Sequence, residues 1–401
     1  MKIKKTHIPV ILAGILLILL VGALIYVIFF MKDSNRIKDN YYAKKINDYK
    51  MEVQVVSYNE GDSVVDLEHM DYQEIKVNNY VNNQLVDNEI FSGSIKVVSQ
   101  DDGFILYSYS NDSFIMKTDL NFKTKWIYKP SKDGYQIKTI LVKSNKIYAI
   151  LSNDNNVYGT TFDLKGKKSK YVEITNIDKY NSVDVVAFDD SFIMYSEKSP
   201  VINFNKIDLD FKLEGNSLNL VEKHSDLIGS NVMIQGMTSK NNKAYYFIQS
   251  FYRGGTNNII GIIDNNLNEV SFKNINDVFA NKLSASLFNN NVYINDGNKV
   301  VIYNADTGVK TERDFSSMVS EDDPMMIYVY GDSKQEILYT NVGNSYVIDV
   351  YEENKLKKTM VINLDNEQIK GVPLYALSQD NKLYVLSSAN NYSLYLNKYE
   401  F

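Results

Sequence analysis

The sequence of 401 residues contains no cysteine and has only three arginines, three histidines and one tryptophan. The absence of cysteine excludes disulfide bonds, thiolate nucleophiles, cysteine-ligated zinc and a lipidated cysteine. The net charge is −6, whereas binding to nucleic acid requires clustered lysine and arginine. We therefore expect no nucleic-acid partner.

Histidine is scarce beyond the amino-terminal apolar run, where only His69 and His224 occur. Two histidines and no G-x-S-x-G segment argue against a Ser-His-Asp triad and against a histidine-rich zinc site. His69 follows acidic residues and His224 lies in an expected loop, where a solvated histidine is the ordinary interpretation. The sequence predicts no catalytic residue, no metal ligand and no cofactor.

The number and positions of the arginines and acidic residues bear on three further kinds of site: a sialidase site, a glycosidase site and a calcium site. Propeller sialidases use an arginine cluster, and only Arg253 and Arg313 are available here. A glycosidase with two carboxylates stays an alternative, although most acidic residues occupy turns. Residues 101–102 and 321–323 supply carboxylates for calcium, but neither segment has the spacing of a calcium-binding loop.

One apolar run, Ile8–Met31, is long enough to cross a membrane. As a helix it would span roughly 36 Å, more than a hydrocarbon core of about 30 Å. The rival interpretation is a cleaved signal peptide, whose apolar region is only about 7–15 residues long and ends in a small-x-small site. We expect a transmembrane signal anchor over residues 8–31, in contact with membrane lipid.

Lysines lie on both sides of this run, so charge asymmetry does not decide its orientation. We expect residues 1–7 to be a cytoplasmic tail, because they are few and the folded bulk has no cysteine. The protein would then be a single-pass protein of the cell membrane with an extracytoplasmic carboxy-terminal domain. Residues 32–70 are expected to be a stalk or linker, either a short helix or a solvated coil.

The rest of the chain repeats one unit, clearest in residues 144–174 (SNKIYAILSNDNNVYGTTFDLKGKKSKYVEI). It holds two strand-like stretches, a turn rich in polar residues and glycine, and a third, more polar stretch. The unit occurs seven times at a spacing of roughly 42–51 residues, the period of a four-stranded blade. Each repeat begins with a short apolar strand: Ile95–Ser99, Ile137–Val142, Val183–Phe188, Val232–Met237, Leu283–Phe288, Met325–Tyr330 and Val372–Leu377. We therefore predict an all-β fold, a seven-bladed β-propeller over residues 71–401.

The later strands of each repeat predict its orientation. The third strand runs into a turn led by Asp or Asn, as in Asp119–Lys123 and Asp163–Lys167, where these residues tolerate the required dihedral angles. The fourth strand is polar and carries lysine or other charges, as in Ser169–Ile174, which suits an exposed edge. The first strand should therefore lie innermost.

The seventh repeat ends at Phe401 without a fourth strand. An upstream strand should complete it, as in propellers that close with both ends of the chain. Asp71–Val77 resembles the other fourth strands best, and Met51–Tyr58 is the alternative. A chain entering through a fourth strand would place the stalk and membrane at one face. The loops between second and third strands would then face away from the membrane.

Two segments resemble a known class of repeat. Lys117–Lys129 (KTDLNFKTKWIYK) and Val301–Thr311 (VIYNADTGVKT) are similar to the Asp-x-x-Thr-Gly-Lys-x-x-Trp pattern of quinoprotein-like and YVTN-type propellers. The resemblance covers residues 95–401. It implies the propeller fold and no particular activity.

One loop is a candidate for partner binding. The fourth repeat has Phe251, Tyr252, Arg253, Gly254 and Gly255 between its second and third strands. Aromatic residues beside arginine are frequent interface hot spots, and glycine lets such a loop adapt. An extended hairpin with ordinary strand aromatics is the alternative.

These patterns favour a membrane-anchored extracytoplasmic propeller that serves as a protein-binding or scaffolding module of the bacterial cell envelope. The expected partner is an envelope protein. Two alternatives remain: a surface protein that binds or degrades glycan, and a ligand sensor that works through a membrane partner.

Overall fold

The computed structural model describes sixteen stretches of the chain: residues 53–57, 80–87, 95–109, 113–130, 134–177, 182–198, 201–229, 231–252, 255–279, 284–315, 325–332, 334–342, 345–363, 372–379, 382–388 and 394–400. The expected anchor Ile8–Met31 and most of the expected stalk lie outside these stretches. Within them, no helix combines the length and apolar character needed to cross a membrane.

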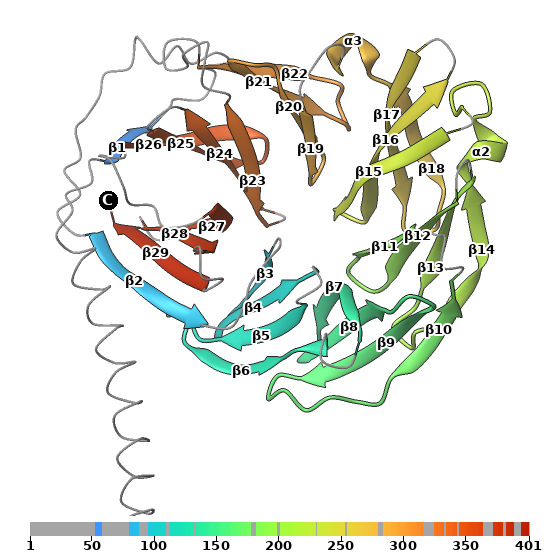
Figure 1. The fold of residues 1–401 in the computed structure, drawn as a ribbon, viewed down its shortest axis with the longest axis horizontal. Helices are drawn as coiled ribbons and strands as arrows, with labels where there is room; N and C mark the ends of the chain where they lie inside the picture. Colours follow the sequence, from blue (N-terminus) through green and yellow to red (C-terminus); the bar gives the residue numbers. More distant parts are fainter. Residues whose placement is uncertain are drawn as a thin grey trace, which may run out of the picture.

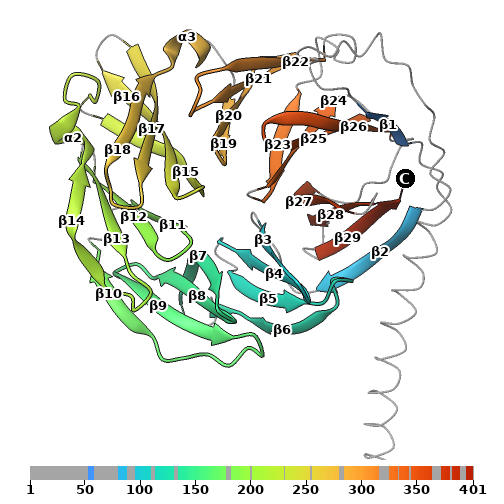
Figure 2. The same cartoon turned by 180° about the vertical axis from the view of Figure 1, so that it is seen from behind.

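The strands in these stretches form seven antiparallel sheets, arranged around one axis (Figures 1 and 2). The first contains β3 (Ile95–Gln100), β4 (Gly103–Ser108), β5 (Phe114–Thr118) and β6 (Thr124–Tyr128). The second contains β7 (Gln136–Lys143), β8 (Lys146–Ser152), β9 (Asn156–Asp163) and β10 (Val172–Asn176). The third contains β11 (Ser182–Ala187), β12 (Phe192–Lys198), β13 (Val201–Ile207) and β14 (Leu213–Asn219).

The remaining four sheets follow in chain order. The fourth contains β15 (Asn231–Lys240), β16 (Lys243–Tyr252), β17 (Gly255–Asp264) and β18 (Glu269–Asn274). The fifth contains β19 (Ser284–Phe288), β20 (Asn291–Asn295), β21 (Lys299–Asn304) and β22 (Lys310–Asp314). The sixth contains β23 (Met326–Gly331), β24 (Gln335–Val342), β25 (Ser345–Glu352), β26 (Lys355–Asn363) and β1 (Val53–Ser57). The seventh contains β27 (Val372–Gln379), β28 (Lys382–Ser388), β29 (Leu394–Glu400) and β2 (Tyr80–Asp87).

The first strand of every sheet lies nearest the axis, and neighbouring sheets contact one another around the circle (Figure 1). Two single-turn helices, α2 (Leu220–Lys223) and α3 (Asn276–Phe279), follow the outer strands of the third and fourth sheets. This arrangement confirms the prediction of an all-β propeller with its first strands innermost.

The two ends of the ring carry different connections between strands. Each sheet repeats the same up-and-down order, so the inner strands all begin at one end of the axis. We call this end the mouth. The connections between second and third strands also lie there, since the end of β4 pairs with the start of β3. The opposite end, with the turns between first and second strands, is the turn end.

The seventh sheet is completed by an upstream strand, as expected, but a different one. β2 pairs with β29 in the outermost position, with Tyr80 opposite Tyr399. The expected strand, Asp71–Val77, lies outside the described residues. The choice of Asp71–Val77 as the closing strand was therefore wrong, because β2 already fills the edge beside β29.

The segment that contains Met51–Tyr58 has another place in the ring. β1 adds a fifth strand outside β26, with Val53 opposite Ile362. Since β26 ends at the mouth, an antiparallel β1 begins there, and the chain reaches Val53 from the mouth end. The expectation of a helix or coil over residues 32–70 is therefore wrong for residues 53–57, which form a strand of the ring. The face on which the membrane lies stays a prediction.

The turns between third and fourth strands join neighbouring sheets. In three of them the fourth turn residue has a left-handed backbone although it is apolar, with φ values of 60° at Phe122, 64° at Phe211 and 63° at Leu267. The leading aspartate holds each turn; for example, Asp208 Oδ1 accepts the Lys212 amide at 2.8 Å. Left-handed backbone costs a branched or bulky residue free energy, so burial must offset this cost.

Each of these apolar turn residues packs against the neighbouring sheet. Phe122 is fully buried and its ring lies 5.8 Å from that of Tyr384 in the seventh sheet. Phe211 lies against Gly159 of the second sheet, where a Cβ atom would come within 2.1 Å of its ring. Leu267 joins the core of the third sheet. In the turn of the second sheet, the neighbouring sheet supplies the large side chain instead. Gly166 leaves room there for the ring of Trp126 from the first sheet, because a Cβ atom would come within 2.9 Å of that ring.

The fifth and sixth sheets are also joined by a buried ion pair. Arg313 of β22 donates from Nε and Nη2 to the two carboxylate oxygens of Asp349 at 2.7 and 2.8 Å. Thr359 donates its hydroxyl to the same carboxylate. Such a pair needs all its partners, because one buried charge left alone is strongly destabilising.

Replacing Phe211 tests whether burial offsets the strained turn. Phe211→Ala should lower the free energy of unfolding by about 3 kcal/mol or more, because it empties a buried aromatic site. Phe211→Gly should cost about 1 kcal/mol less than Phe211→Ala, because glycine accepts the left-handed backbone. Urea unfolding measures both, with exposed Leu120→Ala as a control that changes stability little. Equal losses for the two variants would contradict the strain argument.

Candidate functional site

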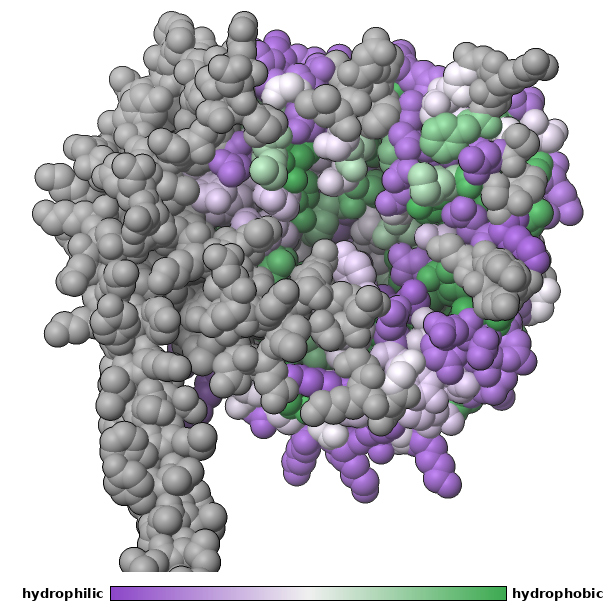
Figure 3. Space-filling view, in the orientation of Figure 1, coloured by the Kyte–Doolittle hydropathy of each residue, from purple (hydrophilic) through white to green (hydrophobic). Residues whose placement is uncertain are grey.

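The axis of the ring holds a cavity of about 950 Å³ lined by the inner strands. Figure 3 shows the hollow near the centre of the molecule, with hydrophobic and polar side chains mixed around it. The inner strands leave this space because seven twisted sheets meet at the axis with short side chains there, such as Ala285, Ser286 and Gly236. A cavity of this size suits a ligand or a segment of polypeptide.

Three charged side chains lie on the inner strands of the first three sheets. Lys96 is the second residue of β3, Lys138 the third of β7 and Asp184 the third of β11, and all three line the cavity. Lys96 is exposed to the cavity although the ring surrounds it, whereas Lys138 and Asp184 are half-buried. Asp184 Oδ1 accepts the amide of Val185 at 2.8 Å.

The electrostatics of these groups depend on one another. Tyr107, opposite Lys96 on β4, and Asp184 raise the pKa of Lys96 although burial lowers it. Burial raises the pKa of Asp184, and the charges of Lys96 and Lys138 oppose this rise. Lys96 therefore stays positively charged at neutral pH, whereas burial favours the neutral form of Asp184 and the two lysines favour its carboxylate form.

Tyrosines form the wall across from these charges. Tyr328 and Tyr330 both lie on β23, with stacked rings 6.2 Å apart. The Tyr330 hydroxyl donates to the carbonyl of Pro373 in the seventh sheet. Tyr109 follows β4, and its ring lies 5.4 Å from Lys96 Nζ, a cation–π contact.

The mouth also exposes apolar side chains. Met233 of β15 is 44% exposed, Met326 of β23 is 49% exposed and Tyr109 is 43% exposed. The strand order brings all three to the mouth, because β15 and β23 begin there and β4 ends there. Methionine and tyrosine are enriched in protein interfaces.

The predicted partner loop lies at the same end. Phe251 and Tyr252 end β16, and Gly255 begins β17, with Tyr252 paired to Gly255. Phe251 is also opposite Asn231, the first residue of β15. Arg253 and Gly254 lie outside the described residues. The loop therefore joins the mouth as a hairpin, and its partner-binding role stays a prediction.

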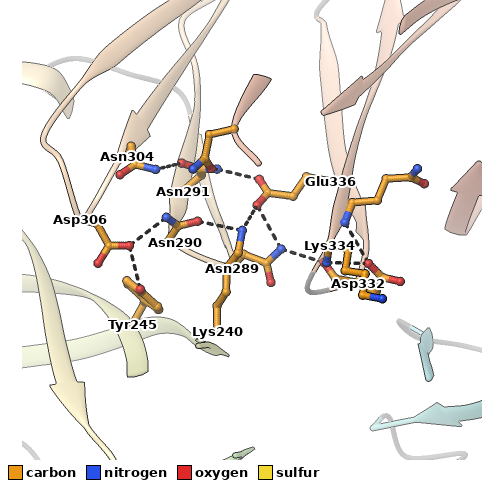
Figure 4. A network of polar contacts seen from close by, with 12 residues as sticks. Lys240, Tyr245, Asn289, Asn290, Asn291, Asn304, Asp306, Asp332, Lys334 and Glu336 are labelled. Carbon is orange, nitrogen blue, oxygen red and sulfur yellow. Dashed lines mark hydrogen bonds and ion pairs between the residues drawn. The ribbon is translucent and has the colours of Figure 1, made fainter. Parts of the chain in front are cut away.

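A polar network lies at the turn end (Figure 4). Buried Glu336 accepts Asn289 Nδ2 at 3.0 Å and Lys240 Nζ at 3.2 Å on one oxygen. Its other oxygen accepts Asn291 Nδ2 at 2.7 Å and Tyr293 Oη at 2.5 Å. The network joins the fourth, fifth and sixth sheets and satisfies the buried carboxylate, so its role is structural.

Among the described residues, carboxylates do not converge in the cavity. The two aspartates in its lining are Asp184, on an inner strand, and Asp332, in the turn after β23. Asp332 Oδ1 accepts the amides of Lys334 and Gln335 at 2.8 and 2.9 Å, which is turn chemistry. Across the stretches that the structure describes, no three His, Cys, Asp or Glu side chains are grouped to hold a metal ion.

The other residues singled out from the sequence have separate places. His224 follows α2 and its Nε2 lies 2.5 Å from Glu269 Oε2, with its ring stacked on Phe272. Asp102 pairs with Lys117 at 2.8 Å and with Lys125 at 3.3 Å. His69 and residues 321–323 lie outside the described residues. The structure brings neither His224 nor Asp102 to the cavity.

The charged cavity residues were not identified from the sequence. Lys96 and Lys138 are 42 positions apart in the sequence, and Lys138 and Asp184 are 46 positions apart. A signal was present, since each is a charged residue inside a short apolar strand predicted to be innermost. An inward-facing charge on such a strand must line the axis.

Comparisons with known proteins give the fold alone. No family model matches the chain, and no curated protein matches its sequence. Drosophila Semaphorin 2a is 8% identical, with a TM-score of 0.45 over 80% of this chain and 75% of that chain. The Dos1 propeller is 9% identical, with a TM-score of 0.44 over 74% and 75%. TolB from Acinetobacter baumannii is 15% identical, with a TM-score of 0.34 over 69% and 65%.

The turn-end network predicts a large effect of one isosteric change. Glu336→Gln should lower the free energy of unfolding by about 3 kcal/mol, because it leaves Lys240 without its partner and turns an amide donor toward another donor. Glu214→Gln, which removes an exposed pairing with Lys206, is the control and should change it by less than about 1 kcal/mol. Urea unfolding of both variants provides the measurement. A loss for Glu336→Gln no larger than that of the control would contradict the structural role.

Asp184 and Asp102 should respond to pH in opposite ways. Burial raises the pKa of Asp184, so its charge opposes folding at neutral pH, and Asp184→Asn should raise the Tm at pH 7. The hydrogen bond from Lys117 lowers the pKa of Asp102, so Asp102→Asn should lower the Tm at pH 7. The Asp184 difference should shrink as the pH falls through the raised pKa of that carboxyl, above the ordinary aspartate value of about 4, whereas the Asp102 difference should shrink only below about 4. Thermal unfolding between pH 3 and 8 would measure both. The same sign for both variants at pH 7 would refute this assignment.

Proposed function

We propose that the protein is a membrane-anchored, extracytoplasmic β-propeller that binds a partner protein of the bacterial cell envelope at the mouth of its channel. The seven sheets would act as seven blades of one closed ring, a rigid scaffold. Contacts between the inner strands of neighbouring sheets support this closure. The fold itself is compatible with a protein-binding module.

The single observation that carries the proposal is the composition of the mouth. Met233, Met326 and Tyr109 are exposed there, whereas most large apolar side chains of the ring are buried. Other apolar side chains, such as Leu120 and Val309, are exposed elsewhere on the ring, but these three lie at the end where the charged cavity residues also lie, and exposed apolar groups beside a cavity suit an interaction site. The separated carboxylates of the cavity favour binding over glycoside hydrolysis, which needs a facing pair.

The path of the chain suggests where the partner lies. With a span ending at Met31, 21 residues (32–52) would connect the membrane to β1, which begins at the mouth. A helix of this length would reach about 30 Å, and an extended chain about 70 Å. The mouth would then lie within reach of the membrane surface, so we favour a partner in the same membrane.

Crosslinking of intact cells with a membrane-impermeant, lysine-reactive reagent tests this function. Mass spectrometry should identify crosslinks from lysines of the propeller to one membrane or envelope protein. Labelled lysines without a protein partner would instead favour glycan or small-molecule binding. Absence of label on a protein that is present in the cells would contradict the extracytoplasmic orientation.

Variants at the mouth should separate partner binding from stability. Met233→Ser with Met326→Ser should reduce the crosslinked partner several-fold, because it removes apolar contact area from the interface. Tyr252→Ala with Arg253→Ala should also reduce it if the predicted loop takes part. Val270→Ser with Val309→Ser is the control, because these residues are similarly exposed but lie on β18, the outermost strand of the fourth sheet, and in the turn between β21 and β22. Quantitative mass spectrometry measures the crosslinked partner, and the Tm measures stability. Unchanged crosslinking in the methionine variant would exclude the mouth as the partner-binding site.

A further inference from the structure

We propose that the partner inserts an acidic segment of polypeptide into the channel, where an aspartate, a glutamate or its terminal carboxylate pairs with Lys96 and Lys138. This inference rests on the proposed function, since it names the chemistry of the partner at the same mouth. It comes from the charges of the inner strands.

Within the part of the chain that the structure describes, the two lysines have no counter-ion in direct contact. Among the described residues, neither Lys96 nor Lys138 takes part in a hydrogen bond or salt bridge, and the group that Lys96 contacts is the ring of Tyr109. Other enclosed lysines are paired: Lys117 with Asp102 at 2.8 Å, and Lys240 with Glu336 at 3.2 Å. The enclosed lysines Lys117 and Lys240 are therefore paired with carboxylates, whereas within the described residues Lys96 and Lys138 are not.

The local charge is unbalanced. Among the described residues, Asp184 is the acidic side chain whose charge acts on Lys96 and Lys138, so the three groups together carry at least one positive charge. The other charged residues of the described lining, Lys334 and Asp332, have opposite signs and lie at the turn end. An incoming carboxylate would offset the positive charge near the mouth, and charge-assisted hydrogen bonds in a partly desolvated cavity are stronger than neutral ones.

A polypeptide fits the rest of the channel better than a small free anion does. The cavity of about 950 Å³ is much larger than a carboxylate group. Its wall also offers neutral hydrogen-bonding groups, Gln235, Thr238, Ser239 and Ser286, which can pair with peptide amides. The exposed Met233 and Met326 at the mouth would cover apolar side chains of the same segment.

The test is selection of a random heptapeptide phage library on the immobilised full-length protein in mild detergent. Selected peptides should be enriched in Asp and Glu, and synthetic copies should bind more weakly as salt rises. Lys96→Gln and Lys138→Gln should each weaken binding by about tenfold, the loss expected for one charged hydrogen bond. Lys146→Gln, an exposed lysine at the turn end, is the matched control. Lys96→Glu with Lys138→Glu should shift the selection toward basic peptides, provided that its Tm is retained.

The outcomes separate this inference from the proposed function. Peptides without acidic enrichment that lose binding in the Met233→Ser and Met326→Ser variant would overturn the inference and leave the mouth as a docking site. Failure to select any peptide would overturn the inference, while the crosslinking experiment tests the proposed function separately. Citrate or inorganic phosphate bound by the wild type, lost in Lys96→Gln and without selected peptides, would replace the polypeptide with a small anion.

Discussion

The packing of one sheet against the next is the interaction on which the rest of the molecule depends. A four-stranded sheet with two apolar faces is stable only when both are covered, and in this ring each sheet covers its neighbours. The left-handed turns place Phe122, Phe211 and Leu267 in these interfaces. The buried pair of Arg313 and Asp349 adds a polar junction. The channel exists because the twisted sheets meet at the axis with short side chains, which leave it unfilled.

The two ends of the channel use polar residues in different ways. At the turn end, Glu336 has hydrogen-bond donors on both carboxylate oxygens, and the asparagines around it connect three sheets. Near the mouth, Lys96 and Lys138 line the cavity, and among the described residues neither has a carboxylate in direct contact. Satisfied buried groups stabilise a fold, whereas a charge left without a direct partner on the wall of a cavity is available to a ligand.

Much of the architecture was predictable because strand period, apolar stretches and turn chemistry are local properties. The innermost strands, including Val183–Phe188 and Val372–Leu377, were located to within a few residues of β11 and β27. The closing strand was misassigned, because several upstream segments alternate like strands and edge pairing depends on which one meets β29. The fifth strand of the sixth sheet was missed for the same reason, since pairing of Val53 with Ile362 spans most of the chain.

The sequence alone determined the class of fold, the inward position of each first strand and the exclusion of cysteine chemistry, since these follow from short-range patterns and composition. Only the tertiary structure decided which residues meet at the axis. Lys96, Lys138 and Asp184 are far apart in the chain and come together because consecutive sheets rotate about a common axis. Met233, Met326 and Tyr109 lie at one end of the ring because every sheet has the same up-and-down strand order, so that β15 and β23 begin at the mouth and β4 ends there.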